Sequence, residues 1–258
     1  MDSRILSLLQ QLKPITLDEM SSIRLMNRLD TKYVTTKRKL CQLLEVVKNE
    51  YYAQEINGDR ISPYITTYFD TPDHFMFIQH HNGHANRKKV RVRTYLSSGD
   101  LTFLEVKNKN NHGRTKKKRV RVSGLENFRN DEGTYELVEK YALLNLDNLD
   151  MMVQNQFDRV TLVNFGKTER LTIDFNVKFH NFETGLESNT GELVIIELKR
   201  DGNIYSPILN ILRDMHIQPS GFSKYCIGTC LTNPDVKKNN FKMRLRNIAK
   251  FIKGQTRV

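Results

Sequence analysis

Alternating apolar and polar residues predict several β-strands that each have one charged face. In residues 89–95, Val90 and Val92 alternate with Arg91 and Arg93. Because successive side chains of a strand point to opposite faces, the two valines share one face and the two arginines share the other. The same division between aliphatic and charged positions recurs in residues 103–107, 117–122, 156–161, 170–175 and 194–199. We therefore expect a sheet with one aliphatic face and one mainly cationic face.

Apolar residues at helical spacing predict helices at both ends of the chain and in its middle. The predicted helical segments are residues 5–12, a short helix opened by a capping box at 16–19, a helix capped by Thr36, residues 134–144, a helix opened by Ser206-Pro207, and residues 224–230. Further strands are expected at 28–34 and 64–69, which gives about eight. Turns are short, and neither a glycine-rich phosphate loop nor βαβ alternation is found. The expected fold is α+β, an eight-stranded antiparallel β-barrel or tunnel with a charged lumen, flanked by helices.

The segment 233–258 differs from the rest of the chain by its excess of lysine and arginine, which runs to Arg257. Phe241, Leu245, Ile248 and Ile252 recur in it at helical spacing. We expect residues 1–232 to form the tunnel domain and residues 233–258 to form a basic amphipathic tail. The tail could lie on an anionic membrane surface, dock on a membrane protein, or pack on the barrel with its basic face in solvent.

The charge of the chain points to a polyanionic partner. A formal net charge of +12 over 258 residues suits nucleic acid, polyphosphate, a nucleotide or an anionic membrane surface. Three scattered cysteines argue against a disulfide framework, and Cys226 and Cys230 are expected to be buried thiols. No apolar run reaches the length of about 18 residues that a membrane span needs. We expect a cytoplasmic protein that could be peripheral at a membrane.

The charged faces, taken together, predict a lumen lined by cations with a few carboxylates. Such a concentration of like charge is repulsive unless an anion occupies the lumen. Lysines suit phosphate as point charges and arginines as bidentate forks, whereas sparse carboxylates suit a divalent cation that bridges phosphate oxygens. A flat sheet with a solvated basic face is the alternative. The predicted inward residues are Lys32, Arg91, Arg93, Lys107, Lys117, Arg119, Arg159, Arg170 and Lys199, with Glu105, Asp174 and Glu197.

Short motifs at these positions resemble those of a known family. They are Leu29-Asp-Thr-Lys-Tyr33, Tyr68-Phe-Asp-Thr-Pro72, Val90-Arg-Val-Arg93, Leu104-Glu-Val-Lys107, Lys117-Lys-Arg119, Leu171-Thr-Ile-Asp174, Ile196-Glu-Leu-Lys199 and Ser223-Lys-Tyr225. In this order they resemble the catalytic domain of the vacuolar transporter chaperone polyphosphate polymerases, within the triphosphate tunnel metalloenzyme superfamily. The resemblance implies a tunnel that transfers the γ-phosphate of ATP to a growing polyphosphate chain, using Mn²⁺ or Mg²⁺.

The resemblance also implies roles for individual residues. Glu197 would hold the metal, with Glu105 and Asp174 as further candidates, and Lys224 would reach into one mouth of the tunnel from a helix. Lys118 is ranked below Lys117, because its parity places it on the apolar face. Catalytic roles fall to Lys32, Arg91, Arg93, Lys107 and Lys224, and substrate binding to Lys117, Arg119, Arg159, Arg170 and Lys199.

Two other functions remain open, hydrolysis and non-catalytic binding. Hydrolytic relatives carry two glutamates and a lysine on the first strand, where this chain has Arg28, Asp30 and Lys32, so transfer is favoured over hydrolysis of triphosphate or polyphosphate. A non-catalytic sensor of polyphosphate or inositol phosphate could share every cation. A nucleic-acid partner is not expected, because aromatic residues are not interleaved with the basic faces.

Two groups of residues have simpler explanations. The pairs Asp30–Lys32 and Glu197–Lys199 could be structural ion pairs across neighbouring strands. A histidine-rich segment is expected to be a polar loop, in which metal ligation is the minor alternative. Its histidines are His74, His80, His81 and His84.

Overall fold

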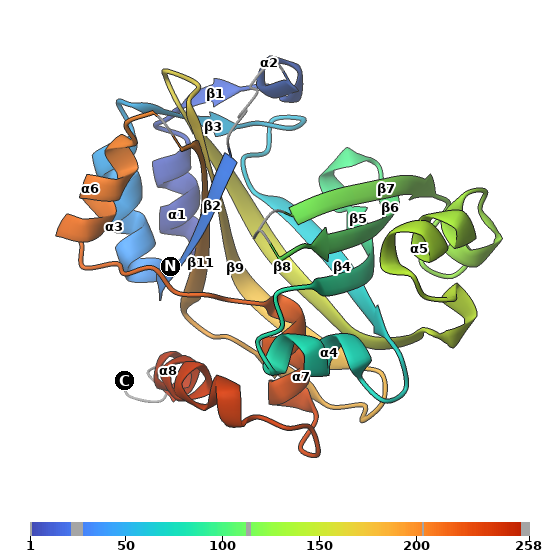
Figure 1. Ribbon diagram of the computed structural model, residues 1–258. Coiled ribbons are helices and arrows are strands. Elements are labelled where there is room, and N and C mark those ends of the chain that lie inside the picture. Colours follow the sequence, from blue (N-terminus) through green and yellow to red (C-terminus); the bar gives the residue numbers. More distant parts are fainter. Residues whose placement is uncertain (1, 22–27, 112–114, 203, 254–258) are drawn as a thin grey trace.

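One antiparallel sheet dominates the computed structural model, which describes residues 2–21, 28–111, 115–202 and 204–253 (Figure 1). Its eight long strands lie in the order β2 (Arg28–Thr36), β11 (Leu193–Asp201), β9 (Glu169–Asn181), β8 (Asp150–Asn164), β4 (Ser62–Asp70), β5 (Arg87–Tyr95), β6 (Leu101–Lys109) and β7 (Thr115–Val122). All neighbours in this order pair antiparallel, as the sequence predicts. Three short strands extend the sheet: β1 (Lys13–Ile15), β3 (Tyr51–Gln54) and β10 (Glu187–Asn189).

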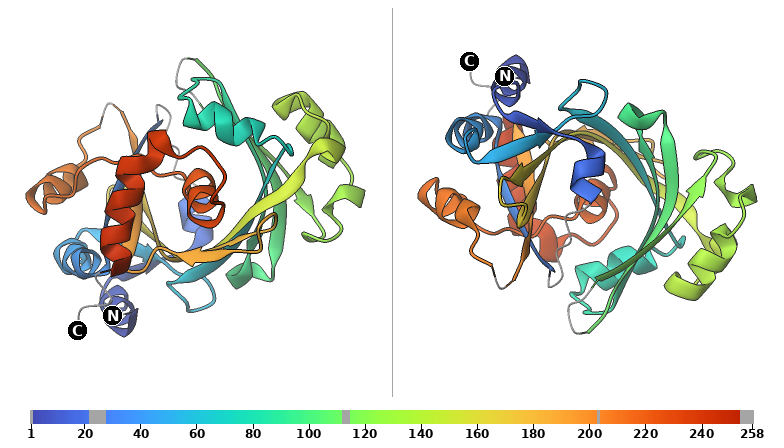
Figure 2. Two further views of the ribbon diagram at one scale, coloured as in Figure 1. Left: turned by 90° about the horizontal axis from the view of Figure 1, so that it is seen from below. Right: turned by 90° about the horizontal axis from the view of Figure 1, so that it is seen from above.

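The two edge strands of the sheet are β2 and β7. Seen from below, the sheet is curved, and α7 (Lys224–Thr232) and α8 (Lys242–Lys253) lie across its concave face (Figure 2). The antiparallel sheet flanked by helices is consistent with the predicted tunnel, but no pairing joins the edge strands β2 and β7 in the part of the chain that is described, so closure into a barrel stays a prediction. The edge strand β7 carries a row of exposed lysines and arginines, and such charges discourage further strand pairing.

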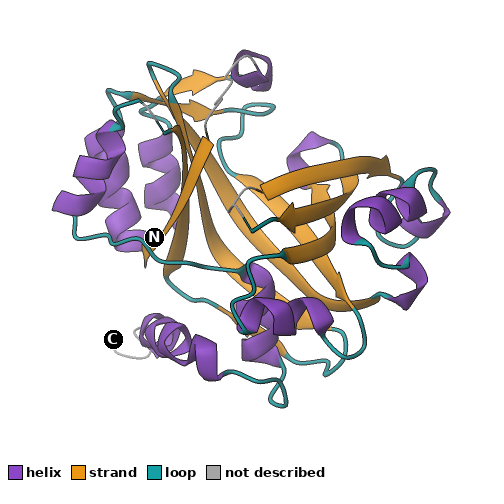
Figure 3. Ribbon diagram, in the orientation of Figure 1, coloured by secondary structure: helices purple, strands orange, loops and turns teal. Residues whose placement is uncertain are grey.

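Helices cover the convex face of the sheet, as the aliphatic parity predicts (Figure 3). At one end α1 (Asp2–Leu9), α3 (Lys37–Val47) and α6 (Pro207–Asp214) pack on β2, β11, β9 and β8, where Leu44 and Ile196 are fully buried. At the other end α5 (Thr134–Ala142) packs on β5 and β6 over Val90 and Leu104. The charged residues of the same strands therefore lie on the concave face of the sheet.

Local capping agrees with the sequence. The Thr36 hydroxyl accepts a hydrogen bond from the backbone N–H of Lys39 at the start of α3. Before α2 (Leu17–Ser21), the Glu19 carboxylate and the Thr16 hydroxyl each accept a hydrogen bond from the other residue's backbone N–H, which is the predicted capping box. Short 3₁₀ turns are η1 (Leu96–Ser98), η2 (Phe128–Asn130), η3 (Leu146–Asn148) and η4 (Asn239–Phe241).

The helix α7 covers one end of the concave face of the sheet with apolar side chains. Tyr225 and Ile227 of α7 pack against Phe157, Phe179 and Ile195 of the sheet. The helix α7 approaches β9 so closely at Gly228 that an added Cβ would lie 2.6 Å from the Phe179 ring. Charged side chains therefore line only the part of the concave face that α7 leaves uncovered. Cys226 and Cys230 of α7 are buried free thiols, as predicted.

The histidine-rich segment is a helix rather than the expected polar loop. The helix α4 (Phe75–His81) begins beside the buried Asp70 carboxylate, which accepts hydrogen bonds from the backbone N–H groups of Met76 and Phe77, both at 2.8 Å. The Tyr225 hydroxyl donates to the same carboxylate at 2.5 Å. Because the Asp70 carboxylate accepts hydrogen bonds from the backbone of α4 and from a side chain of α7, it fixes α4 against α7.

The basic segment after residue 232 packs on the rest of the fold. Phe241 and Ile248 are buried in the cluster that also holds Tyr225. Of the predicted alternatives, packing on the sheet is thus what α8 shows; Arg257 lies outside the described residues. None of the described helices has the length and apolar character needed to cross a membrane.

Candidate functional site

Three carboxylates on the concave face each hold two cations, and Glu105 is the most deeply buried of them. Arg91 donates to its Oε2 through Nε at 2.8 Å and Nη2 at 2.5 Å. Lys117 donates to its Oε1 at 2.8 Å. Burial by itself would raise the pKa of Glu105, but Arg91, Arg93 and Lys117 lower it far below its ordinary value. Glu105 is therefore ionised, and both of its oxygens are occupied by cations.

Asp174 is held in the same way by residues from β8 and α7. Arg159 donates to its two oxygens at 2.6 and 2.7 Å, and the Lys224 ammonium also contacts Oδ2. Burial would raise the pKa of Asp174, yet these two cations lower it below its ordinary value. Burial lowers the pKa of Lys224 to about 8, against the opposing effect of Asp174. Lys224 thus extends from the start of α7, which Ser223 caps, to a carboxylate of the concave face.

Glu197 on β11 is held more loosely. Its carboxylate lies 3.0 Å from the Lys199 ammonium and 3.6 Å from that of Lys32, and its side chain is 22% exposed. Burial would raise the pKa of Glu197, but Lys199, Lys32 and Lys107 lower it well below its ordinary value. Lys107 comes from β6, far from β11 in the sheet order, so curvature brings the two ends of the concave face within electrostatic range.

Other concave groups contact aromatic rings and hydroxyls. Arg93 donates to the Thr66 hydroxyl at 3.0 Å and lies over the rings of Tyr64 and Phe157. Tyr68 accepts a hydrogen bond from Arg91 at 3.4 Å. Burial would raise the pKa of Tyr68, but Arg91, Arg93 and nearby lysines lower it to about 8.

Lys89 and Tyr68 also lie at the site, although neither is among the residues predicted from the sequence. Lys89 donates to the Ser223 hydroxyl at 2.9 Å, and its burial lowers its pKa. Lys89 has the parity of Arg91, so the alternation itself could have identified it. Tyr68 stands in a motif already noted, yet nothing in the sequence distinguishes a tyrosine of the concave face from one of the core.

Of the remaining predicted residues, Arg119 lies on the edge strand β7 and Arg170 on the inner strand β9. Arg119 on β7 is exposed and stacks on the Phe103 ring, 4.3 Å from guanidinium carbon to ring centroid. Arg170 is half-buried and pairs in register with Lys199. Lys118 lies over Tyr141 of α5 on the convex side, as its parity predicts. The side chain of Arg28 lies outside the description, so the predicted Arg28, Asp30 and Lys32 set is seen only in part.

The donor set fits a metal only if phosphate supplies further ligands. Where residues are described, no three His, Cys, Asp or Glu side chains come together in a way that could hold a metal ion. Mg²⁺ is commonly bound through one or two carboxylates together with substrate phosphate and water. Glu197 fits that mode because it is partly exposed and loosely paired. A metal at Glu105 or Asp174 would first have to displace two cations.

Comparisons with known proteins identify the family of the chain. The family model described as VTC domain matches residues 27–233, so the chain belongs to that family. A putative adenylyl cyclase of Hippeastrum, HpAC1, described as having a dominant triphosphatase activity, has a similar structure, with a TM-score of 0.51 at 13% identity over 80% of this chain and 96% of that one. The protein PH1819 of Pyrococcus horikoshii gives a TM-score of 0.44 at 12% identity over 79% and 98%. A comparison with curated protein sequences finds no match.

Proposed function

We propose that this member of the VTC domain family is a metal-dependent phosphotransferase that moves the γ-phosphate of ATP onto a polyphosphate chain. One observation carries the proposal: cations from β2, β5, β7, β8, β11 and α7 form ion pairs with three carboxylates of one concave surface, and Lys107 of β6 lies within electrostatic range of one of them. An extended polyanion complements such a surface better than a compact ligand does, because the cations are spread over many strands.

The residues present can do what phosphoryl transfer requires. The transfer needs mainly in-line positioning and neutralisation of charge on the phosphate oxygens, without a protein nucleophile. The proposed catalytic cations are Lys32, Arg91, Arg93, Lys107 and Lys224, and the cations proposed to hold the chain are Lys117, Arg119, Arg159, Arg170 and Lys199. Ion pairing keeps several of these side chains ordered before substrate arrives, which lowers the entropy cost of binding.

Glu197 is the proposed protein ligand for Mn²⁺ or Mg²⁺. The bound metal would neutralise charge on phosphate oxygens. Lys32 and Lys199, which contact Glu197 in this structure, would then turn to the phosphate oxygens. Hydrolysis of triphosphate or polyphosphate and simple polyphosphate binding are the competing functions of the same surface.

The test is to incubate the purified protein with ATP and Mn²⁺ and to measure long-chain polyphosphate, free phosphate and ADP. Polymer together with ADP supports the proposal. Free phosphate without polymer would replace it with a phosphohydrolase, and binding of polyphosphate without turnover would replace it with a sensor.

A matched pair of variants ties the activity to the concave surface. Lys107→Met removes a concave cation, and Lys118→Met removes a lysine from the neighbouring strand on the convex face. We expect the first to reduce turnover on the order of a hundredfold and the second to leave it nearly unchanged. Equal losses would show that the concave surface is not the site.

A further inference from the structure

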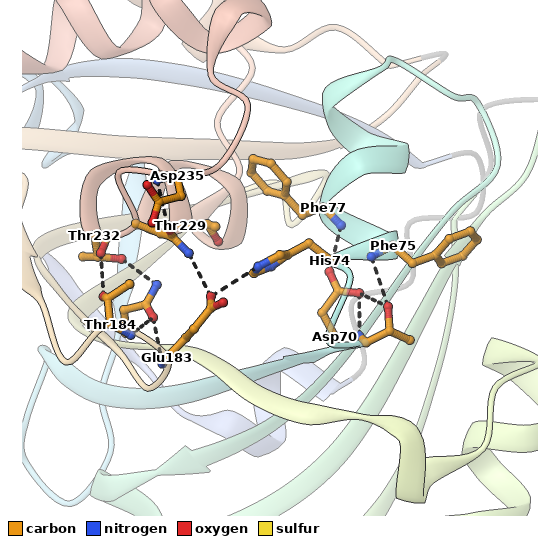
Figure 4. Close-up of polar contacts among 12 residues, drawn as sticks. Asp70, His74, Phe75, Phe77, Glu183, Thr184, Thr229, Thr232 and Asp235 are labelled. Atoms are coloured by element: carbon orange, nitrogen blue, oxygen red, sulfur yellow. Dashed lines mark hydrogen bonds and ion pairs between the residues drawn. The ribbon is translucent and has the colours of Figure 1, made fainter.

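A cavity lies beside α4, and its lining shares no residue with the cationic concave surface. Its volume is about 630 Å³, within the range of about 300–1,000 Å³ that small-molecule sites occupy. Its walls come from α4, from the turn between β9 and β10, and from the segment that follows α7 (Figure 4). These elements are distant in sequence, so only the tertiary structure assembles the cavity.

A fixed carboxylate stands in this cavity. The Glu183 Oε2 accepts a hydrogen bond from Asn233 Nδ2 at 2.8 Å and lies 3.2 Å from His74 Nε2 (Figure 4). No described residue bonds its Oε1, and its side chain is 46% exposed. Asp235 adds a second carboxylate to the lining, without an ion pair among the described side chains. The site therefore offers acceptor oxygens whose positions are set in advance.

The turn between β9 and β10, which carries Glu183, is held by hydrogen bonds that do not involve the Glu183 carboxylate. The Asn181 side-chain oxygen already accepts hydrogen bonds from the backbone N–H groups of Glu183 and Thr184, at 2.9 and 3.1 Å. The Thr184 hydroxyl also donates to the Thr232 carbonyl at 2.7 Å, which ties the turn to α7. A purely structural explanation therefore leaves the free oxygen of the carboxylate without a role.

Two further features of the lining point to a ligand. Phe77, Ile78 and Val236 form an apolar wall, and Ile78 is 41% exposed although it is a large aliphatic residue. The Nδ1 atom of His74 is buried without a hydrogen-bond partner in the described structure, so a ligand that donates to it would satisfy this nitrogen.

We propose that this cavity binds a small organic ammonium ion, with the charged amine against Glu183 and Asp235 and the hydrocarbon part against Phe77, Ile78 and Val236. The net charge of +12 repels cations from the molecule as a whole, so a cation that binds here needs these local carboxylates. Lys237 lies at the same cavity but is exposed to solvent, which weakens its repulsion. The proposal does not depend on the function of the concave surface.

Titration calorimetry with phenethylamine tests the site directly. Saturable binding of one equivalent is expected, whereas 2-phenylethanol, which has the same ring without the charge, is expected to bind at least about tenfold more weakly. Glu183→Gln should weaken phenethylamine binding by about the same factor. The matched control is Glu187→Gln on β10, where Glu187 is 79% exposed and lies outside the lining, and it should bind like the original protein.

A second variant keeps the test decisive if Glu183→Gln disturbs the turn. Ile78→Trp should fill the apolar part of the cavity and abolish binding, while its exposed position leaves the fold intact, as a thermal-unfolding midpoint would show. The absence of saturable binding, equal binding of the alcohol, or equal loss in Glu187→Gln would each overturn the proposal. None of these outcomes bears on ATP turnover.

Discussion

The clusters around Glu105 and Glu197 each pair one glutamate with two cations but differ in how completely the carboxylate is paired. Glu105 is fully buried, and its oxygens meet Arg91 and Lys117 at 2.5 to 2.8 Å. Glu197 is 22% exposed and meets its lysines at 3.0 and 3.6 Å. Asp174, which Arg159 contacts at 2.6 Å and which is almost fully buried, resembles Glu105.

The difference separates two uses of a carboxylate within one cationic surface. A buried carboxylate whose oxygens are both occupied holds arginine and lysine side chains in place and compensates their buried charge. A partly exposed carboxylate with long contacts can exchange a lysine for a metal or for water at lower cost. We therefore expect the Glu105 cluster to act mainly on stability and the Glu197 cluster mainly on function.

The largest expected effect is on turnover. Glu197→Gln should reduce metal-dependent turnover on the order of a hundredfold or more, because it removes the negative charge that would hold the metal. Polyphosphate binding should remain or become slightly tighter, since two lysines lose their partner. Steady-state kinetics over a range of Mn²⁺ concentrations and a binding titration at fixed salt measure both. Retention of full activity would erase the distinction between the two clusters.

The next effect is on stability and concerns Glu105. Glu105→Gln leaves the buried Arg91 without its ion-pair partner, so the free energy of unfolding should fall by about 3–5 kcal/mol. Urea denaturation measures the loss. Glu197→Gln is the matched control and should cost about 1 kcal/mol or less, because its contacts are long and partly in solvent. Similar losses in the two variants would contradict the comparison.

A third effect should appear in the pH dependence of polyphosphate binding. The pKa of Lys224 is about 8, and a lysine carries its charge below its pKa, so its attraction for phosphate is lost as pH rises through about 8. Tyr68, also with a pKa of about 8, becomes negative over the same interval and acts in the same direction. Affinity at constant salt should fall by up to about tenfold per pH unit for each group. Lys224→Arg and Tyr68→Phe should each flatten the profile; an unchanged profile in both would refute these assignments.

The smallest expected effect compares two adjacent lysines of β7. Lys117→Ala removes a partly exposed concave cation and should weaken polyphosphate binding a few-fold and reduce its salt dependence, by roughly one charge. Lys118→Ala, on the convex face over Tyr141, should change neither quantity appreciably. Binding titrations at several salt concentrations make the comparison. Equal effects would indicate that the polyanion reaches the convex face.

Sequence alone determined which strand residues face the concave surface. The two-residue period of a strand places Arg91 opposite Val90 wherever the strand lies, and the need to bury the valine sends the arginine to the other side. The capping of α3 by Thr36 and the helix carrying Lys224 were equally predictable, because both depend on neighbouring residues.

Tertiary structure decided which charges meet and how far the charged surface extends. The contact of Lys224 with Asp174, the approach of Lys107 to Glu197 and the apolar filling by α7 depend on the curvature of the sheet and on helix docking. The helix α4, read from sequence as a polar loop, forms because Asp70 supplies the hydrogen bonds for its first turn while Phe77 packs against Tyr225. Periodicity is a local property of the chain, whereas these contacts join residues that only the folded structure brings together, so no local pattern encodes them.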